Sequence, residues 1–242
     1  MVAQQALGAM PPTQSGATYP GTQSFDGKWS GTAFYPEETL PYFDFFFKGP
    51  TSEHTGYMPN EKLFTTLQSN SPELKVLDVQ GRNLDAETMG AVTNALLGNT
   101  QVVEAKLGRN VSFWNEQPDD FGQALAAVLK ENTSITKLDA KNNDIEEDEM
   151  EAIMKALETN TTLTWLDLSD NFGRSKGKEI GGMLKANKTL KYLNLNVNQL
   201  HDEDCEAVLA GLEANTTLQE FSGYNNGAIS KETRKKMRGF KR

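Results

Sequence analysis

Histidine and cysteine, the residue types most typical of nucleophilic and zinc sites, are scarce in this chain. It contains two histidines, His54 and His201, and a single cysteine, Cys205. Both histidines fall in expected loops, without the residues that a Ser-His-Asp or Cys-His site requires. Cys205 lies on the apolar stripe of an expected helix, which indicates a packed core thiol rather than a reactive one. We therefore predict no catalytic residues and no internal disulfide.

Two short segments have the composition of ligand-binding loops but not the required pattern. Residues 173–178 (GRSKGK) are one residue short of a phosphate-binding loop, and Glu179 stands where that loop needs Ser or Thr. Residues 144–151 (DIEEDEME) lack the glycine and the alternation of a calcium loop, so an acidic helix start explains them better. Paired Cys and His residues for zinc are absent from the sequence. The prediction is a non-enzyme with no cofactor and no metal.

The charge is negative overall but positive at one end of the sequence. The net charge is −9 and the pI is about 4.9, which argues against a general nucleic-acid-binding protein. Residues 231–242 carry seven Lys/Arg against one Glu, a net of +6, so the other 230 residues stand at −15. Two interpretations are open for Lys235, Lys236 and Arg238. They complement a helix dipole and an acidic body, or they dock on an anionic surface such as actin, tubulin or lipid.

The elements that would position any site come from an internal repeat. Its first apolar anchors are spaced by 28, 33, 28, 27 and 28 residues: Leu74, Val102, Ile135, Leu163, Leu190 and Leu218. Each unit follows the form L-x-x-L-x-L-x-x-N-x-L, the leucine-rich repeat pattern. Its clearest copy is Leu190, Leu193, Leu195, Asn198 and Leu200. The fold class predicted is therefore α/β, a leucine-rich repeat solenoid with a curved parallel sheet on the concave side and helices on the convex side.

Each unit also predicts a turn and a helix. A buried asparagine is expected to satisfy backbone groups where the coil leaves the strand. This slot holds Asn110, Asn143, Asn171, Asn198 and Asn226, with Arg82 in the first unit. Residues 146–158 and 202–213 place apolar side chains at helical spacing. Residues 61–70 and 229–242 are expected to form helices that cap the two ends of the solenoid.

Several stretches carry a resemblance to a known family. They are ALLGNTQVVEAKLGRN (95–110), LAAVLKENTSITKL (125–138), ALETNTTLTWLDLSDN (156–171) and GLEANTTLQEFSGY (211–224), the last followed by a basic C-terminal segment. Over about residues 62–242 the chain resembles the ribonuclease-inhibitor class of leucine-rich repeats, and within it the repeat domain of tropomodulin and leiomodin. That resemblance implies regulation of actin filaments at their pointed ends. Residues 1–61 have none of the amphipathic helices that bind tropomyosin and actin in that family.

Alternation along each strand predicts which side chains point away from the core. The candidate protein-binding residues on the concave face are Trp165, Asp167, Tyr192, Asn194 and Tyr224. Trp165 and Tyr192 share one position of successive repeats, and strands about 4.8 Å apart would bring their rings together. Two interpretations are open: an interface hot spot for a partner, or a stacked pair that only covers the sheet.

The first sixty residues differ in composition from the repeats. Residues 1–24 are rich in Gln, Gly, Pro, Thr and Ser, and twelve of the 21 aromatic residues lie between Tyr19 and Phe64. We predict an extended N-terminal arm over 1–60 and a repeat domain over 61–242. Three interpretations are open for the aromatic side chains of the arm. They pack on the first repeat, insert into a partner protein, or touch a membrane. The candidates are Trp29, Phe43, Phe45, Phe46 and Phe47.

The expected location is intracellular, either cytoplasmic or cytoskeletal, or within an organelle if a targeting segment has been removed. No apolar run approaches the 18 residues of a membrane span, and MVAQQALGAMPP lacks the regions of a signal peptide. Five Asn-x-Ser/Thr sequons recur with the repeat rather than marking secretion: Asn110, Asn132, Asn160, Asn187 and Asn215. The predicted function is a non-catalytic scaffold, a structural or accessory subunit of a larger assembly. The alternative is the tropomodulin-like regulator of actin filaments.

Overall fold

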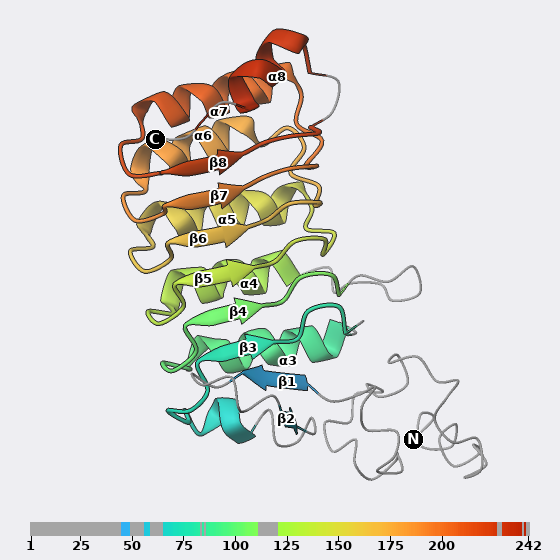
Figure 1. Ribbon diagram of the computed structural model, residues 1–242, viewed down its shortest axis with the longest axis vertical. Coiled ribbons are helices and arrows are strands. Elements are labelled where there is room, and N and C mark those ends of the chain that lie inside the picture. Colours follow the sequence, from blue (N-terminus) through green and yellow to red (C-terminus); the bar gives the residue numbers. More distant parts are fainter. Residues whose placement is uncertain are drawn as a thin grey trace, which may run out of the picture.

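The chain forms a single row of repeats, each built from one short strand and one helix (Figure 1). The computed structural model describes residues 45–48, 56–58, 65–82, 84, 86–110, 121–226, 229–238 and 240. Six strands are parallel: β3 (Val76–Asp78), β4 (Glu104–Lys106), β5 (Lys137–Asp139), β6 (Trp165–Asp167), β7 (Tyr192–Asn194) and β8 (Glu220–Ser222). The labelled helices are α3 (Ala86–Leu97), α4 (Phe121–Glu131), α5 (Glu147–Thr159), α6 (Gly177–Ala186), α7 (Asp202–Ala214) and α8 (Lys231–Arg238).

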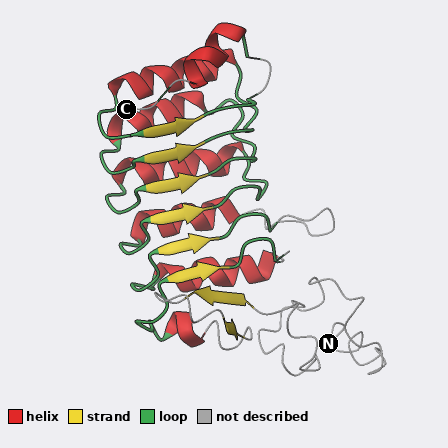
Figure 2. Cartoon of the chain, in the orientation of Figure 1, coloured by secondary structure: helices red, strands yellow, loops and turns green. Residues whose placement is uncertain are grey.

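The strands line one side of the molecule and the helices line the other (Figure 2). The sheet order is β2-β1-β3-β4-β5-β6-β7-β8, so the parallel strands follow one another in sequence order. The predicted leucine-rich repeat solenoid is thereby confirmed. The helices expected at 146–158 and 202–213 appear as α5 and α7, displaced by no more than one residue at either end.

The N-terminal edge of the sheet is closed by two antiparallel strands. Strand β1 (Phe45–Lys48) pairs with β3, and β2 (Gly56–Met58) pairs with β1. The backbone of Phe45–Phe47 therefore extends the sheet of the first repeat. A helical turn at 65–68 buries Leu67 beside it, within the predicted capping segment. The division between residues 60 and 61 remains a prediction.

The core is a ladder of apolar side chains that each repeat contributes at the same register. The middle residue of each parallel strand faces inward and is buried: Leu77, Ala105, Leu138, Leu166, Leu193 and Phe221. All six sequence anchors of the repeat, from Leu74 to Leu218, are buried as well. Because no repeat can bury these side chains alone, stacking on its neighbours stabilises each one.

Asparagine side chains connect the repeats where the strands end. We call Asn110, Asn143, Asn171, Asn198 and Asn226 the strand-end ladder. Asn171 Nδ2 donates to the carbonyls of Ala140 (3.2 Å) and Leu168 (3.0 Å). Its Oδ1 accepts from the backbone N–H groups of Asn143 (3.0 Å) and Ile145 (3.1 Å). The predicted role of this slot, to satisfy backbone groups at the turn, is confirmed.

A second set of asparagines forms equivalent hydrogen bonds with backbone groups at the opposite end of the strands. We call Asn99, Asn132, Asn160, Asn187 and Asn215 the helix-end ladder. Asn187 Nδ2 donates to Leu157 O (2.7 Å), while its Oδ1 accepts from the backbone N–H groups of Thr189 (2.9 Å) and Leu190 (2.8 Å). The side chain of Asn187 is 2% exposed. The sequons at Asn132, Asn160, Asn187 and Asn215 therefore recur with the repeat, as predicted, and the structure adds that each of these asparagines is buried.

Glycines allow the helices of adjacent repeats to approach closely. A Cβ on Gly181 of α6 would lie 2.4 Å from Ala207 O in α7, and one on Gly211 would lie 2.7 Å from Gly181 O. These distances are too short for any side chain, so α6 and α7 touch through their backbones. The repeat pattern did not predict this contact.

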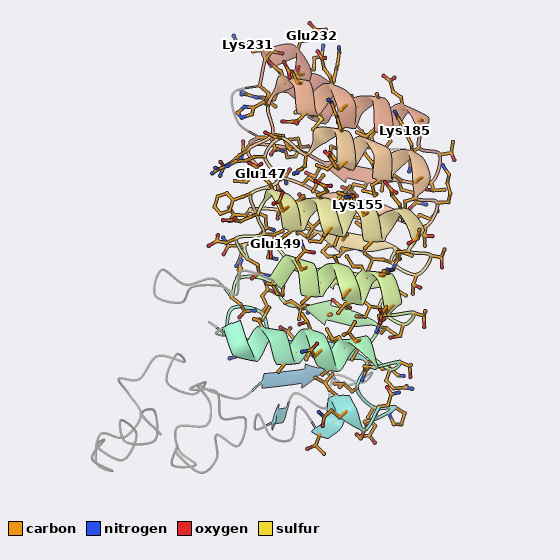
Figure 3. The ribbon with its side chains drawn as sticks, turned by 180° about the vertical axis from the view of Figure 1, so that it is seen from behind. Glu147, Glu149, Lys155, Lys185, Lys231 and Glu232 are labelled. Atoms are coloured by element: carbon orange, nitrogen blue, oxygen red, sulfur yellow. The ribbon has the colours of Figure 1, made fainter. Side chains whose placement is uncertain are left out.

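On the helix side of the molecule, acidic and basic side chains lie toward opposite ends of the helices. Figure 3 shows Glu147 and Glu149 toward the N-terminal end of α5, with Lys155 and Lys185 toward the C-terminal ends of α5 and α6. The acidic first turn of α5 and Lys185 in the last turn of α6 complement the helix dipole. Hydrogen bonds from Lys155 (2.5 Å) and from Lys176 (2.8 Å) lower the pKa of Glu151 to about 2. The acidic segment 144–151 thus behaves as the helix start that its sequence indicated.

Candidate protein-binding surface on the sheet

The outward side chains of the parallel strands form a continuous surface, which we call the sheet face. They occupy the first and third positions of each strand, on either side of the buried middle residue, and in β5–β8 we include the residue two positions beyond the strand. The backbone fixes their spacing, because the strands pair residue for residue from β3 to β8.

A stacked column runs across three successive strands of the sheet face. Trp165 and Tyr192 are register partners, and their rings stack with centroids 4.9 Å apart and planes inclined by 5°. Lys137, the register partner of Trp165 on the preceding strand, places its Nζ 4.9 Å from the centroid of the Trp165 ring. The expectation that Trp165 and Tyr192 lie side by side is confirmed. The sequence did not single out Lys137 as a third member, although it occupies the same repeat position.

The column presents polar groups that have no partner in the described part of the chain. There, no group accepts a hydrogen bond from the Trp165 indole nitrogen or the Tyr192 hydroxyl. Both side chains are half-buried. Burial raises the pKa of Tyr192 above its ordinary value, and the carboxylates of Asp167, Glu220 and Asp139 raise it further. Tyr192 is therefore a protonated donor at neutral pH, in a negative local potential.

We call the part of the sheet face on β3–β5 the charged half. Its lysines form ion pairs with carboxylates of the same surface. Its charged members are Asp78, Glu104, Lys106, Lys137, Asp139 and Lys141. Lys106 pairs with Asp78 at 3.3 Å, Lys137 with Glu104 at 3.0 Å, and Lys141 with Asp139 at 2.7 Å. Each lysine of this half already has a carboxylate, so little net charge is left for a partner.

The part on β6–β8 is composed differently, and we call it the aromatic half. Its members are Trp165, Asp167, Ser169, Tyr192, Asn194, Asn196, Glu220, Ser222 and Tyr224. This set holds two carboxylates and no lysine or arginine. The nearest cation in sequence is Lys191, whose ammonium lies 3.4 Å from the carbonyl of Thr217. The aromatic half therefore combines ring surface with carboxylates and has no lysine or arginine among its own members.

Two of the predicted binding residues shape turns. Asp167 is 7% exposed, and its carboxylate accepts from the backbone N–H (2.9 Å) and the hydroxyl (2.6 Å) of Ser169. Asn194 is 9% exposed and accepts from the backbone N–H of Asn196 at 3.0 Å. Their direct contact area is small. Asp167 contributes to the surface chiefly through its charge.

Tyr224 is the most exposed aromatic residue of the aromatic half, with 38% of its surface accessible. It follows β8, and its backbone N–H donates to Asn196 Oδ1, which also accepts from Ser222 Oγ at 2.9 Å. This asparagine ties the turns of two repeats together and so fixes the position of Tyr224 beside the column.

The basic segment forms α8, which caps the C-terminal end of the solenoid (Figure 3). Met237 is fully buried, whereas Lys235 and Lys236 are exposed, and Lys236 pairs with Glu232 at 3.2 Å. Arg238 is the last residue of the helix. The helix thus has an apolar side that packs on the repeats and a cationic side that faces outward. Both interpretations of the cations remain open.

The remaining predicted residues divide between the described and undescribed parts of the chain. Phe45, Phe46 and Phe47 contribute their backbones to β1. Trp29 and Phe43 lie outside the described residues. Whether the aromatic arm contacts a partner is therefore still a prediction.

The described residues hold little chemistry. Cys205 is fully buried, and burial raises the pKa of its thiol to about 11, so the packed core thiol is confirmed. His201 is exposed and immediately precedes α7, whereas His54 lies outside the described residues. In the part of the chain that the structure describes, no cluster of His, Cys, Asp and Glu has the arrangement of a metal site. No described helix is both long and apolar enough to cross a membrane.

Comparison with known proteins places the fold. No family model and no curated protein matches the chain. The solved structure of leiomodin-1 actin-binding site 2 is similar, with 28% sequence identity and a TM-score of 0.53, over 62% of this chain and 86% of that one. A tropomodulin C-terminal domain from Caenorhabditis elegans has 15% identity and a TM-score of 0.43, over 73% and 87%. An internalin from Listeria monocytogenes has 17% identity and a TM-score of 0.32, over 73% and 63%.

The repeat geometry and the first of these likenesses agree. The chain is a leucine-rich repeat protein. Its repeat domain is similar to that of leiomodin, as the repeated sequence stretches indicated.

Proposed function

We propose that this chain is a non-catalytic protein-binding scaffold, a structural or accessory subunit of a larger assembly. The observation that carries the proposal is the stacked Trp165–Tyr192 pair on the sheet face. Trp and Tyr are enriched among the residues that dominate binding energy at interfaces. A solenoid characteristically uses its strand side as an extended binding surface.

The stability of the fold gives little reason for an aromatic pair at this position. The core beneath it is closed by Leu166 and Leu193, both fully buried. An aromatic pair stabilises a fold by about 0.5–1.5 kcal/mol beyond the contribution of its buried area. The preceding repeats have no aromatic pair at this position. Recognition of a partner is the more economical explanation for two large half-exposed rings.

Quantitative affinity capture from native extract tests the scaffold. The double variant Trp165→Ala/Tyr192→Ala is expected to lose the partners that the unaltered chain retains. The matched control is Lys106→Ala/Lys141→Ala in the charged half, which should retain them. Equal recovery by the two double variants, both shown to be folded by circular dichroism, would exclude the sheet face as the contact.

The N-terminal arm and α8 are secondary contacts in this proposal. Deleting residues 1–44 preserves β1 and removes Trp29 and Phe43, so it separates partner binding from closure of the sheet. We expect weaker incorporation into the assembly together with an unchanged unfolding midpoint. Replacing Lys235 and Lys236 by Gln tests docking of α8 on an anionic surface in the same assay. An intracellular location, cytoplasmic or cytoskeletal, accords with these contacts.

A second candidate function is regulation of actin filaments at the pointed end. It is favoured by the 28% identity to leiomodin-1 actin-binding site 2. Elongation of pyrene-labelled actin from pointed ends measures it directly. Slower elongation at micromolar protein would support this function, and an unchanged rate at saturating protein would eliminate it.

A further inference from the structure

The outward side of α8 is a cationic surface at one end of the molecule. The helix lies at the C-terminal end of the solenoid, beyond α7 (Figure 1). Between its first and last residues the sequence holds five Lys/Arg and one Glu, a net charge of +4. Four of these cations have exposed side chains, and we call them the α8 cations: Lys231, Arg234, Lys235 and Lys236.

Little of this positive charge is neutralised within the described part of the chain. No described carboxylate lies within ion-pair distance of Lys231 or Lys235. Lys236 pairs with Glu232 at 3.2 Å, but the two side chains are 60% and 80% exposed, so the pair is weak. Arg234 donates to the carbonyl of Ile229 at 3.5 Å, a neutral group that leaves the guanidinium charge in place. The α8 cations are therefore available to an outside surface.

The last repeat anchors α8 at both of its ends. Met237, the one apolar residue of the helix, is fully buried, and a Cβ added to Gly223 would lie 2.6 Å from Met237 Cε. At the start of the helix, Ser230 Oγ accepts from the backbone N–H of Thr233 at 3.2 Å. The backbone N–H of Ser230 donates to Asp202 in α7 at 2.9 Å. The cations are thus presented on a fixed element.

The helix dipole does not account for these cations. A dipole favours positive charge in the last turn of a helix and disfavours it in the first turn. Lys235 and Lys236 lie toward the favoured end, whereas Lys231 is the first residue of the helix. The α8 cations share their exposure rather than a position near the C-terminus.

We propose that the α8 cations bind anionic lipid headgroups, so that the solenoid docks by its C-terminal end on a negatively charged membrane surface. This inference rests on the anionic docking that the proposed function gives to α8, and it names the surface. Clusters of about four to eight Lys/Arg on an amphipathic helix are typical of binding to anionic lipids. Near such a surface each cation raises the affinity by about fivefold.

An acidic protein fits the outward side of α8 less well than a lipid surface does. Aromatic residues are enriched at protein interfaces and lysine is depleted there. Helix α8 exposes lysines and no aromatic or apolar side chain. The sheet face of the same molecule has the opposite composition, with the stacked Trp165 and Tyr192. The composition of α8 therefore favours lipid headgroups.

The acidic repeats oppose this contact only over a short range. Exposed charges are screened over about 8 Å at physiological ionic strength. Neighbouring strands are about 4.8 Å apart, so repeats beyond the second from the end contribute little. Helix α7, which packs against α8, exposes Glu203 and Glu206 and is the main source of repulsion.

Sedimentation of the full chain with lipid vesicles tests this inference. The vesicles contain phosphatidylcholine alone or phosphatidylcholine mixed with phosphatidylserine, at about 0.15 M salt. We expect the chain to sediment with the phosphatidylserine vesicles only, and to be released at about 1 M salt, where charges are screened over about 3 Å. Lys235→Gln/Lys236→Gln should weaken binding about tenfold or more, and Glu203→Gln/Glu206→Gln should strengthen it about two- to fivefold.

The matched control is Lys130→Gln/Lys185→Gln, which removes the same charge from exposed lysines in the last turns of α4 and α6. It should change the affinity by less than about twofold. The inference is overturned if the two lysine double variants weaken binding equally, or if both kinds of vesicle bind equally well. It is also overturned if the chain does not bind phosphatidylserine vesicles at about 1 mM lipid. Binding to immobilised poly-glutamate without binding to the vesicles would assign α8 to an acidic protein and overturn it too.

Failure of this inference can be distinguished from failure of the scaffold function. Vesicle sedimentation involves no protein partner and no residue of the sheet face. If the vesicles do not bind but Trp165→Ala/Tyr192→Ala abolishes partner capture, the function stands and the inference fails. If the vesicles bind but that double variant leaves capture unchanged, the sheet-face function fails and the lipid contact of α8 is retained.

Discussion

The charged half and the aromatic half of the sheet face share a backbone and differ in everything that a partner would meet. Both rest on parallel strands paired residue for residue. In the charged half, lysines and carboxylates neutralise one another across neighbouring strands. In the aromatic half, Trp165 and Tyr192 stack, and the surrounding charge is negative. The repeat requires the buried side chains beneath the sheet, whereas it leaves the outward side chains free to vary.

What the repeat requires is identical beneath the two halves. Asn143 lies below the charged half and Asn198 below the aromatic half. Asn143 donates to the carbonyls of Leu107 and Ala140, and Asn198 to those of Leu168 and Asn196. Each side chain also accepts a backbone N–H from the preceding repeat. The hydrogen bonds of the strand-end ladder are therefore alike beneath the charged half and beneath the aromatic half.

The largest effect on stability should come from this ladder, equally in the two halves. Asn143→Ala and Asn198→Ala should each lower the free energy of unfolding by about 2–4 kcal/mol, because buried backbone groups lose their partners. Urea unfolding followed by circular dichroism measures both. A loss below about 1 kcal/mol at either site would contradict the role of the ladder.

The largest difference between the halves should appear in partner binding. Trp165→Ala is expected to weaken the isolated complex by about 2 kcal/mol or more, roughly thirtyfold, as hot-spot residues do. Lys141→Ala, in the charged half, should change the affinity by less than about threefold. Isothermal titration with the purified partner measures both. Equal losses at the two sites would remove the distinction between the halves.

The environment of Tyr192 can be measured through its pKa, which burial raises first and the nearby carboxylates raise further. The difference between the ultraviolet titrations of the unaltered chain and of Tyr192→Phe should show a pKa above the ordinary value of 10.0. Because the folded state holds this proton more tightly than the unfolded state, the free energy of unfolding should fall as the pH rises above about 10. Glu220→Gln should move the pKa back toward the ordinary value. If the pKa of Tyr192 is the same in Glu220→Gln as in the unaltered chain, the carboxylate of Glu220 does not act on this ring.

The smallest effect should come from the ion pairs of the charged half. A double-mutant cycle on Glu104 and Lys137, whose side chains are 23% and 44% exposed, should give a coupling of about 0.2–1 kcal/mol. Thermal or urea unfolding of the four proteins provides the values. A coupling above about 2 kcal/mol would make this half a structural ion-pair site rather than a solvated surface.

The sequence predicted the solenoid because leucines and asparagines recur with the period of the fold. It also predicted the contact between Trp165 and Tyr192, because equal positions in successive repeats must be neighbours. It did not predict the burial of Asp167, which depends on whether the carboxylate turns back to Ser169 or outward. Nor did it predict the close contact of Gly181 with α7, because the repeat pattern does not encode the distance between helices.

The antiparallel strands β1 and β2 were beyond prediction for a different reason. Residues 45–48 and 56–58 stand outside the repeat, so no period sets their partner or direction. Their pairing depends on which edge of the sheet remains open after the repeats have stacked. The aromatic composition left open packing on the first repeat, insertion into a partner and contact with a membrane, and none of these specified a strand.

Crosslinking of the native complex tests most directly whether the sheet face is the contact surface. Lys137 and Lys191 lie at the stacked column and beside it, whereas Lys155 and Lys185 lie on the helix face (Figure 3). If partners bind the sheet face, crosslinks should form at Lys137 and Lys191 and disappear in Trp165→Ala/Tyr192→Ala. Crosslinks confined to Lys155 and Lys185, and unchanged in that variant, would show that the partner occupies the opposite side of the molecule.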